Sequence, residues 1–178
     1  MEKGIYIMSY RTKTYIAADW TGDTIVIEQL KKWNESDYWS LSFVDAHDLT
    51  QARDDSLNCS IKSSLRTRLN VSKTFVLIVG SETKNLRSGS CGYCYSYNSW
   101  NYSCSRGHSV DYRSYIEYEC DMAVRDNLKI VVIYNSSVVD KSKCIDSVKD
   151  KGIHLPVYYW ENGKKYWNYN EIKEAMQK

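Results

Sequence analysis

A carboxylate inside an apolar helix face is the feature of this sequence best suited to chemistry. Residues 111–124, DYRSYIEYECDMAV, have a helical period in which Ile116 and Cys120 share the inward face. Glu119 falls about 60° from Ile116, inside the apolar arc, whereas Glu117 falls on the solvated side. A negative charge held there could stabilise the oxocarbenium-like state through which an N-glycosidic bond breaks. The simpler alternative is that Glu119 pairs with a Lys or Arg or reaches the surface.

A second set of candidate side chains lies in the segment that leads to this helix. The spacing C-x2-C-x9-C-x3-H places four potential metal ligands together: Cys91, Cys94, Cys104 and His108. Such a set could hold a structural zinc ion. The nine-residue gap is unusual for a zinc module, so reduced thiols or a labile disulfide are the alternatives. We expect no resident cofactor, with a structural zinc left open.

The elements that would position these residues alternate between strand and helix. Apolar runs predict five strands, at residues 4–8, 39–44, 74–79, 130–134 and 154–159. Helical patterns follow them at 24–33, 54–69, 113–127, 141–149 and 168–177. Strands that are apolar on both faces are typical of a covered parallel sheet. The sequence therefore predicts an α/β, flavodoxin-like fold, with a parallel five-stranded sheet and helices on both faces.

Length and composition indicate one domain without a nucleic-acid or membrane partner. The chain has 178 residues and a net charge of +2, and it contains no apolar run long enough to span a membrane. The amino terminus lacks the features of a signal peptide, so we expect a cytoplasmic protein. Residues 1–178 are predicted to form a single domain, interrupted by a long Cys- and Tyr-rich loop at about 82–112.

Ligands of such folds bind outside the carboxyl ends of the strands, so the residues after each strand are candidates. These are Ser9, Tyr10, Arg11, Asp45, Gly80 and Ser81. Asp45 could alternatively accept a phosphoryl group or hold Mg²⁺. The first strand, however, supplies no companion acid, so a hydrogen-bonding role is favoured.

Four segments resemble the TIR-like family, in particular the TIR-like subunit of the bacterial Thoeris anti-phage system. They are IYIMSYR at the start, FVDA at 43–46, KTFVLIVGSETKN at 73–85 and SYIEYECDMAVRDNLKIVVIY at 114–134. The resemblance extends over roughly residues 4–135 and implies a flavodoxin-like TIR fold.

The same resemblance implies an activity and roles for individual residues. TIR-like enzymes cleave NAD⁺ at the nicotinamide–ribose bond and often form a cyclic ADP-ribose-type signal. The family's catalytic Glu corresponds to Glu119, and its opening helix aromatic, commonly Trp, corresponds to Tyr115. The other residues that would line the NAD⁺ pocket are Ser9, Tyr10, Arg11, Asp45, Gly80 and Ser81. Residues 86–112 are long for the family, which suggests a gate, a metal site or an oligomer contact.

Two functions from different classes follow. The first is an NAD⁺ glycohydrolase or ADP-ribosyl cyclase whose nucleotide product reaches a downstream effector in anti-phage defence. The alternative is a non-catalytic TIR-like scaffold that signals by self-association through its Tyr-rich loop. An enzyme acting on another nucleoside is a third, because the predicted crevice does not identify the base.

Overall fold

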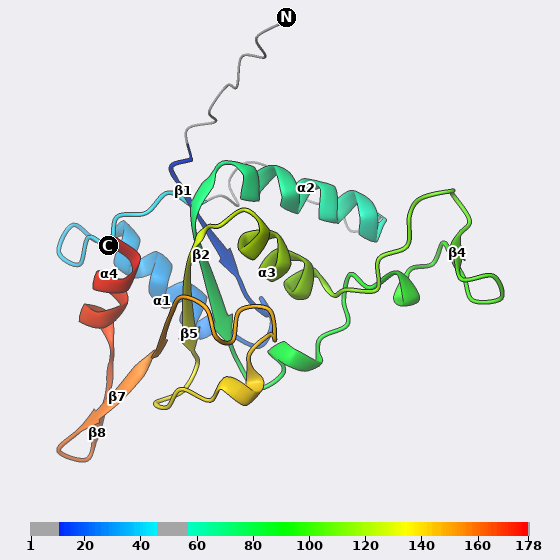
Figure 1. Ribbon diagram of the computed structural model, residues 1–178. Helices are drawn as coiled ribbons and strands as arrows, with labels where there is room; N and C mark the ends of the chain where they lie inside the picture. The colour runs from blue at the N-terminus through cyan, green and yellow to red at the C-terminus, as the bar shows by residue number, and fades with distance from the viewer. Residues whose placement is uncertain (1–10, 46–56, 178) are drawn as a thin grey trace, which may run out of the picture.

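A parallel sheet forms the centre of the chain (Figure 1). The computed structural model describes residues 11–45 and 57–177. Within these ranges the sheet has four parallel strands in the order β1-β2-β5-β6: β1 (Lys13–Ala17), β2 (Ser72–Val79), β5 (Lys129–Tyr134) and β6 (Ile153–Pro156). The predicted α/β parallel sheet is confirmed, with one strand fewer than expected in the part of the chain described.

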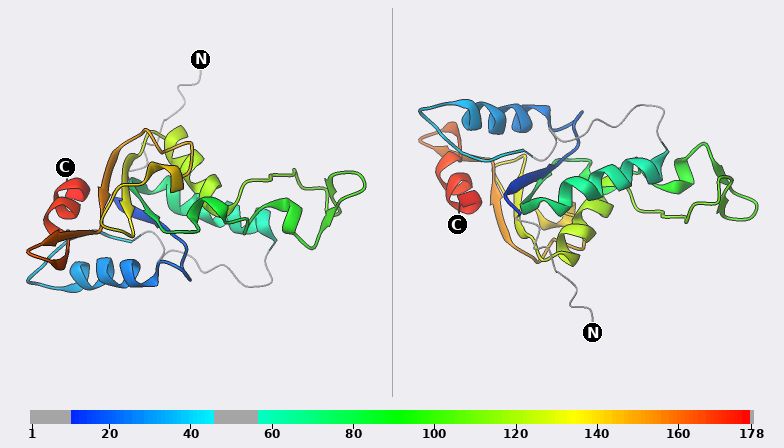
Figure 2. Two further views of the ribbon diagram at one scale, coloured as in Figure 1. Left: turned by 90° about the horizontal axis from the view of Figure 1, so that it is seen from below. Right: turned by 90° about the horizontal axis from the view of Figure 1, so that it is seen from above.

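Helices cover both faces of the sheet (Figure 2). α1 (Thr24–Glu35) and α4 (Tyr169–Gln177) pack on one face, and α2 (Asn58–Asn70) and α3 (Tyr115–Arg125) pack on the other. Successive strand residues point to opposite faces, so Tyr15 packs with α2 and α3 while Ile16 packs with α1 and α4. This alternation gives the molecule two separate cores.

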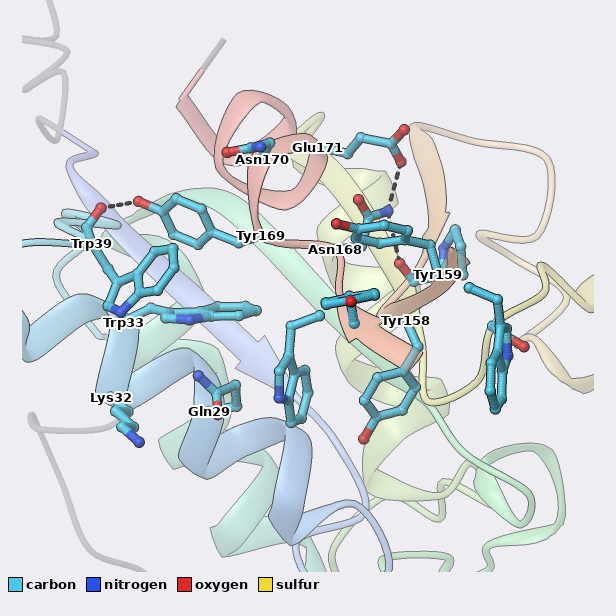
Figure 3. Close-up of a pocket in the computed structure, with 15 residues that line it drawn as sticks. Gln29, Lys32, Trp33, Trp39, Tyr158, Tyr159, Asn168, Tyr169, Asn170 and Glu171 are labelled. Carbon is cyan, nitrogen blue, oxygen red and sulfur yellow. Dashed lines mark hydrogen bonds between the residues drawn. The ribbon is translucent and has the colours of Figure 1, made fainter. Parts of the chain in front are cut away.

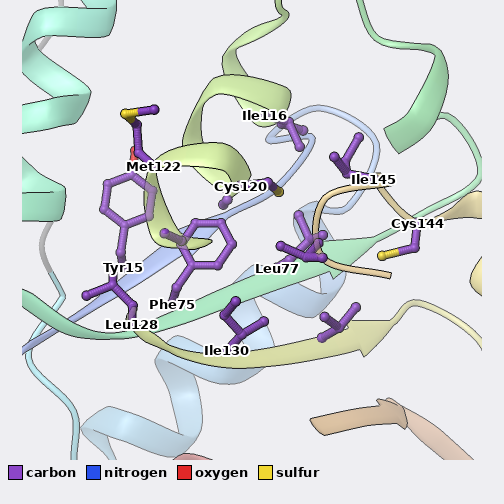
Figure 4. Packing of buried hydrophobic residues seen from close by; sticks show 14 of the residues in the cluster. Tyr15, Phe75, Leu77, Ile116, Cys120, Met122, Leu128, Ile130, Cys144 and Ile145 are labelled. Atoms are coloured by element: carbon purple, nitrogen blue, oxygen red, sulfur yellow. The ribbon is translucent and has the colours of Figure 1, made fainter. Parts of the chain in front are cut away.

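The core under α3 is the one that positions the predicted catalytic helix (Figure 4). Ile116 and Cys120 of α3 pack with Phe75 and Leu77 of β2, and all four are buried. The Tyr15 ring stacks on Phe75 with centroids 5.9 Å apart. Because Tyr15 is fully buried at this position, its hydroxyl must find a partner inside the protein.

Two predicted strands, 74–79 and 130–134, are confirmed as β2 and β5. Residues 4–8 lie outside the described residues, and the strand that precedes α1 is β1 at Lys13–Ala17. The strand predicted at 39–44 is wrong, because Ser40 and Ser42 adopt φ values of +40° and +53°, which an extended strand cannot contain. Only Asp45 forms an isolated bridge, to Thr14.

The carboxy-terminal third also departs from the prediction. The strand expected at 154–159 divides into β6 and β7 (Tyr158–Glu161), and β7 forms a hairpin with β8 (Lys164–Trp167). The helix expected at 141–149 is a single 3₁₀ turn, η4 (Lys141–Lys143), followed by turns. Asp140 accepts hydrogen bonds from the Ser142 amide and hydroxyl, a local arrangement that competes with a continuing helix.

The long loop is irregular, as predicted, and projects from the body of the molecule (Figures 1 and 2). We call residues 82–114 the arm. It contains two 3₁₀ turns, η2 (Thr83–Asn85) and η3 (Cys91–Tyr93), and a hairpin of two-residue strands, β3 (Tyr97–Asn98) and β4 (Ser103–Cys104). The arm leaves the carboxyl end of β2 and returns to the first residue of α3.

Candidate active site

A cavity of about 260 Å³ lies beside the carboxyl end of β1, between α2, α3 and the start of the arm. It contains Glu119. The other lining residues come from the turn after β1, from α2, from the arm and from the first turns of α3: Ala18, Asp19, Trp20, Ile61, Leu65, Arg68, Leu86, Ser88, Ser114, Tyr115 and Ile116. This is the edge of the sheet at which ligands of parallel α/β folds bind. We call it the Glu119 pocket.

The start of α3 fixes which of its two nearby acids enters the pocket. Ser114 is the N-cap, and its hydroxyl accepts a hydrogen bond from the Glu117 amide at 3.1 Å. The Glu117 carboxylate in turn accepts the Ser114 amide at 2.7 Å, which completes a capping box. Glu117 is therefore committed to the helix end, and the helical period directs Glu119 inward.

Glu119 is 6% exposed, and its carboxylate accepts a hydrogen bond from the Tyr15 hydroxyl. Burial raises the pKa of Glu119 from 4.5 to about 7, against the opposing effects of the Tyr15 hydrogen bond and the positive charge of Arg68. A raised carboxyl pKa in a cavity is typical of functional acids. The alternative that Glu119 reaches the surface is wrong.

Arg68 also lines the pocket and supplies a positive charge near Glu119. It lies in the last turn of α2, is 7% exposed and lowers the pKa of both Glu119 and Tyr15. Arg68 was not predicted from the sequence, although the helical period that marks Glu119 also marks Arg68. Arg68 follows Leu65 by three residues and so lies on the apolar face of its helix.

Tyr115 forms the wall of the pocket next to the arm. Its hydroxyl donates to Asn58 Oδ1 at 3.1 Å, and its ring lies against Gly89. Gly89 has φ +94°, and a Cβ there would lie 2.4 Å from Tyr115 Cδ1, so glycine is required both for the backbone and for the ring. The predicted place of Tyr115 in the same pocket as Glu119 agrees with this geometry.

The turn after β1 provides a second aromatic surface. Trp20 is 44% exposed, lines the pocket and has Lys31 Nζ 5.3 Å from the centre of its ring. Asp19 precedes it and accepts the Thr21 amide at 3.0 Å. Neither residue was predicted, because the first strand was expected at 4–8 and the candidates were therefore taken from the residues after Met8 and not from the turn after β1.

Several predicted ligand residues lie elsewhere. Ser9 and Tyr10 are outside the described residues. Arg11 precedes β1, at the opposite end of the strand from the pocket, and donates to the Asp126 carbonyl at 3.1 Å. Because the strand begins after it, Arg11 does not line the Glu119 pocket, so the expectation that it lies next to Glu119 is not met.

The three remaining candidates, Gly80, Ser81 and Asp45, do not line the Glu119 pocket. Gly80 is buried, and its amide donates to Thr83 Oγ1 at 2.8 Å. A Cβ at Gly80 would lie 2.3 Å from Asp23 Oδ1, so this glycine packs on Asp23 and does not line the Glu119 pocket. Ser81 is exposed and also lies outside its lining. Asp45 does not line the pocket, although its charge raises the pKa of Tyr15.

The predicted metal ligands do come together. Cys91, Cys94, Cys104 and His108 line one small cavity between the middle of the arm and the start of α2. In residues 11–45 and 57–177, however, no three Cys, His, Asp or Glu side chains are arranged so that they could hold a metal ion.

A larger and chemically different groove lies on the other side of the sheet (Figure 3). It measures about 1040 Å³ and is formed by α1, the β7–β8 hairpin and the start of α4. We call it the aromatic groove, after Trp33, Trp39, Tyr158, Tyr159, Trp160, Tyr166, Trp167 and Tyr169. Its one carboxylate, Glu171, accepts a hydrogen bond from Asn168 at 2.6 Å. A buried acid with a raised pKa thus distinguishes the Glu119 pocket, and we take that pocket as the candidate active site.

Comparison with known proteins agrees with the fold. Residues 8–88 match the family model described as Thoeris protein ThsB, TIR-like domain, which confirms the TIR-like resemblance. The matched segment contains Trp20 and Arg68 of the pocket and ends before α3, so the position of Glu119 stands on geometry alone. No curated protein matched the chain. None of the helices in the described ranges is long and apolar enough to cross a membrane.

Proposed function

We propose, from the TIR-like assignment and the Glu119 pocket together, that this chain cleaves NAD⁺ at the nicotinamide–ribose bond. The observation that carries the proposal is a buried carboxylate, held by Tyr15, in a cavity at the carboxyl edge of a TIR-like sheet. The ADP-ribosyl product would serve as a nucleotide signal in anti-phage defence and act on a downstream effector.

Cleavage of the nicotinamide–ribose bond is assisted by a negative charge next to the ribose. As the bond between ribose C1′ and the nicotinamide nitrogen breaks, its electron pair moves to the nicotinamide ring and neutralises it, which leaves positive charge on the sugar. A Glu119 carboxylate that is already fixed in place would stabilise that charge without reorganisation. Water, or a hydroxyl of the same ADP-ribose, then bonds to C1′ and loses its proton to solvent. If an adenine ring nitrogen bonds instead through its lone pair, the adenine amino group loses the proton to solvent.

The walls of the pocket suit the leaving group. A volume of about 260 Å³ accommodates the nicotinamide riboside end of NAD⁺ and leaves the adenosine diphosphate part outside. Trp20 and Tyr115 offer aromatic faces to a planar ring. Deprotonated Glu119 also attracts the positively charged nicotinamide ring of the substrate before the reaction begins.

The test is release of nicotinamide. Purified protein is incubated with NAD⁺, and nicotinamide and the mass of the second product are followed by chromatography and mass spectrometry. We expect Glu119→Gln to lower the rate by about a hundredfold or more. The matched control is Glu117→Gln, which changes an acid two residues away and retains a capping-box acceptor. The assignment fails if Glu119→Gln cleaves NAD⁺ as fast as wild type.

Self-association without turnover is the second candidate, and the arm favours it. Trp100 is 94% exposed, Tyr93 is 74% exposed, and Tyr95 and Tyr102 are each 72% exposed. Exposed aromatic side chains at this density are typical of protein interfaces. Light scattering of the full chain, with Trp100→Ser beside wild type, tests this function. A concentration-dependent assembly that Trp100→Ser abolishes, in a protein that releases no nicotinamide, would identify a scaffold.

A further inference from the structure

The tip of the arm, residues 93–105, leaves its largest side chains uncovered. Four of its aromatic residues are each at least 72% exposed: Tyr93, Tyr95, Trp100 and Tyr102. Ser and Asn fill most of the other positions, a composition typical of loops that recognise proteins. The tip contains no Asp, Glu, Lys, Arg or His, so burying it against another protein strands no charge.

Hydrogen bonds within the tip hold it in one shape. β3 pairs with β4, and the Ser105 amide donates to the Ser96 carbonyl at 2.8 Å. Beyond the paired residues, the Trp100 amide donates to Asn98 Oδ1 at 2.9 Å. A loop that is ordered before it binds loses less conformational entropy on binding. The exposed rings of the tip are therefore presented on a prepared surface.

The aromatic groove offers a surface of the same chemistry. Four of its aromatic residues are between 38% and 60% exposed: Trp39, Tyr159, Trp160 and Tyr166. Its volume of about 1040 Å³ has room for several side chains, and rings pack favourably on other rings in offset or edge-to-face arrangements. The lining includes one cation, Lys32, and one anion, Glu171, whose charges cancel. The groove thus suits an uncharged partner that carries several rings.

The arm and the aromatic groove lie at opposite ends of the molecule (Figures 1 and 2). The arm extends beyond α2 and α3, whereas the groove is formed by α1, the β7–β8 hairpin and the start of α4. An arm therefore cannot fill the groove of its own chain, but it can fill the groove of a second copy. A contact between two different surfaces of identical chains is heterologous and continues from molecule to molecule.

We propose that the tip of the arm docks in the aromatic groove of a second copy of this chain, so that the molecules join head to tail. Aromatic residues bury about 150–250 Å² each, so the four exposed rings of the tip can cover roughly 600 Å². A standard interface buries about 800 Å² on each partner, so this contact is weak and forms at high protein concentration. Neither surface includes the Glu119 pocket, and the association is independent of NAD⁺ cleavage.

Sedimentation velocity of the full chain over a range of concentrations, without NAD⁺, tests the proposal. The average mass of wild type should rise with concentration and pass beyond a dimer, because each assembly ends in one unused tip and one unused groove. Trp100→Ser and Trp160→Ser should each weaken association about thirtyfold or more. Ile25→Ser is the control, because Ile25 is 66% exposed but belongs to neither surface. It should associate as wild type does.

A mixture of the two tryptophan variants distinguishes this contact from one between two arms. Each variant alone should be monomeric at concentrations at which wild type associates. In an equal mixture, the intact tip of Trp160→Ser enters the intact groove of Trp100→Ser, and only altered surfaces are left over. The mixture should therefore stop at one-to-one pairs. A mixture that stays monomeric overturns the proposal, as does association that Trp100→Ser loses but Trp160→Ser keeps.

Crosslinking of wild type keeps the proposal testable if a variant fails to fold. Photo-oxidation links tyrosine rings that touch, and mass spectrometry of the digested product identifies the linked pairs. Tyr102 of one molecule should be linked to Tyr159 or Tyr166 of another. Links formed chiefly between two copies of Tyr102, or wild type that is monomeric at every concentration, would overturn the proposal.

Discussion

The Glu119 pocket and the aromatic groove lie on opposite faces of one sheet and differ in kind. The groove is about four times larger in volume and offers eight aromatic residues, yet its carboxylate is already hydrogen-bonded to Asn168. The pocket is small but holds a fully buried acid whose pKa is raised to about 7. A strongly shifted pKa of a buried acid is therefore a better indicator of a reactive site than the volume of the cavity.

The largest expected effect is on the pH dependence of folding stability, which the buried Glu119 carboxyl controls. The folded protein keeps the Glu119 proton up to about pH 7, whereas the unfolded chain releases it near pH 4.5. Folding stability therefore falls as the pH rises between these values, and above pH 7 the ionised acid costs the fold about 3 kcal/mol. Glu119→Gln removes that cost, so chemical denaturation should show it to be more stable than wild type at pH 8. The difference should vanish below pH 4.5; equal stability at both pH values would mean that Glu119 is not buried as described.

Filling each cavity with a large side chain tests which of the two is needed for NAD⁺ cleavage. Ser88→Trp places a large ring in the Glu119 pocket, and Gln29→Trp places one in the aromatic groove. Displacing the substrate by an ångström or more should lower NAD⁺ cleavage about a hundredfold in Ser88→Trp. Gln29→Trp should cleave at the wild-type rate. The opposite result in the nicotinamide assay would move the active site to the groove.

Removing the Tyr15 hydroxyl tests whether its hydrogen bond lowers the pKa of Glu119. Cleavage by wild type should rise with pH around the Glu119 pKa of about 7, since the carboxylate is the active form. Tyr15→Phe removes a hydrogen bond that lowers this pKa, so the pH–rate profile should move to higher pH. At neutral pH the loss should be about tenfold or less, recovered in alkaline buffer.

The control for that shift is Tyr134→Phe. Tyr134 is also buried in the core shared with Tyr15, but its hydroxyl is paired with His154 Nδ1 at 2.9 Å. Its pH–rate profile should coincide with that of wild type. If both variants move the profile equally, the hydrogen bond to Glu119 is not the cause.

The smallest expected effect is the loss of stability when Asn168, which lines the aromatic groove, is replaced. Asn168 is 7% exposed and donates to the Pro156 carbonyl at 3.1 Å and to Glu171, which joins β6 to the start of α4. Asn168→Ala should lower the free energy of unfolding by about 1–2 kcal/mol, measured by urea titration. Nicotinamide release per folded molecule should not change if the reaction takes place in the Glu119 pocket, as proposed.

How much the sequence predicted depends on whether the signal was local. The helical period of α3 was enough to find Glu119, because one residue out of phase with an apolar face is visible in a short window. The same test applied to α2 would have found Arg68. The Asn-Gly pair is another local signal that was not used: Asn162 and Gly163, at φ +50° and +75°, form the turn between β7 and β8.

Features that depend on contacts between distant segments could not be predicted from a short stretch of sequence. The run at 4–8 is more apolar than residues 13–17, which begin with Lys and Thr, and only pairing with β2 identifies Lys13–Ala17 as a strand of the sheet. That pairing moves the candidate ligand turn from Ser9 and Tyr10 to Asp19 and Trp20. Cys59 joins the arm cysteines through the packing of α2, a contact that no spacing rule contains.

The two ends of the arm are fastened independently of its tip. The buried Lys62 ammonium donates to the carbonyls of Asp111 and Arg113, and the Asn58 amide donates to the Ser90 carbonyl. Everything between these anchors can lengthen, shorten or change composition while the wall at Tyr115 stays where it is. The segment between the anchors can therefore change in sequence, and with it the partner that the arm contacts, without altering the wall of the Glu119 pocket.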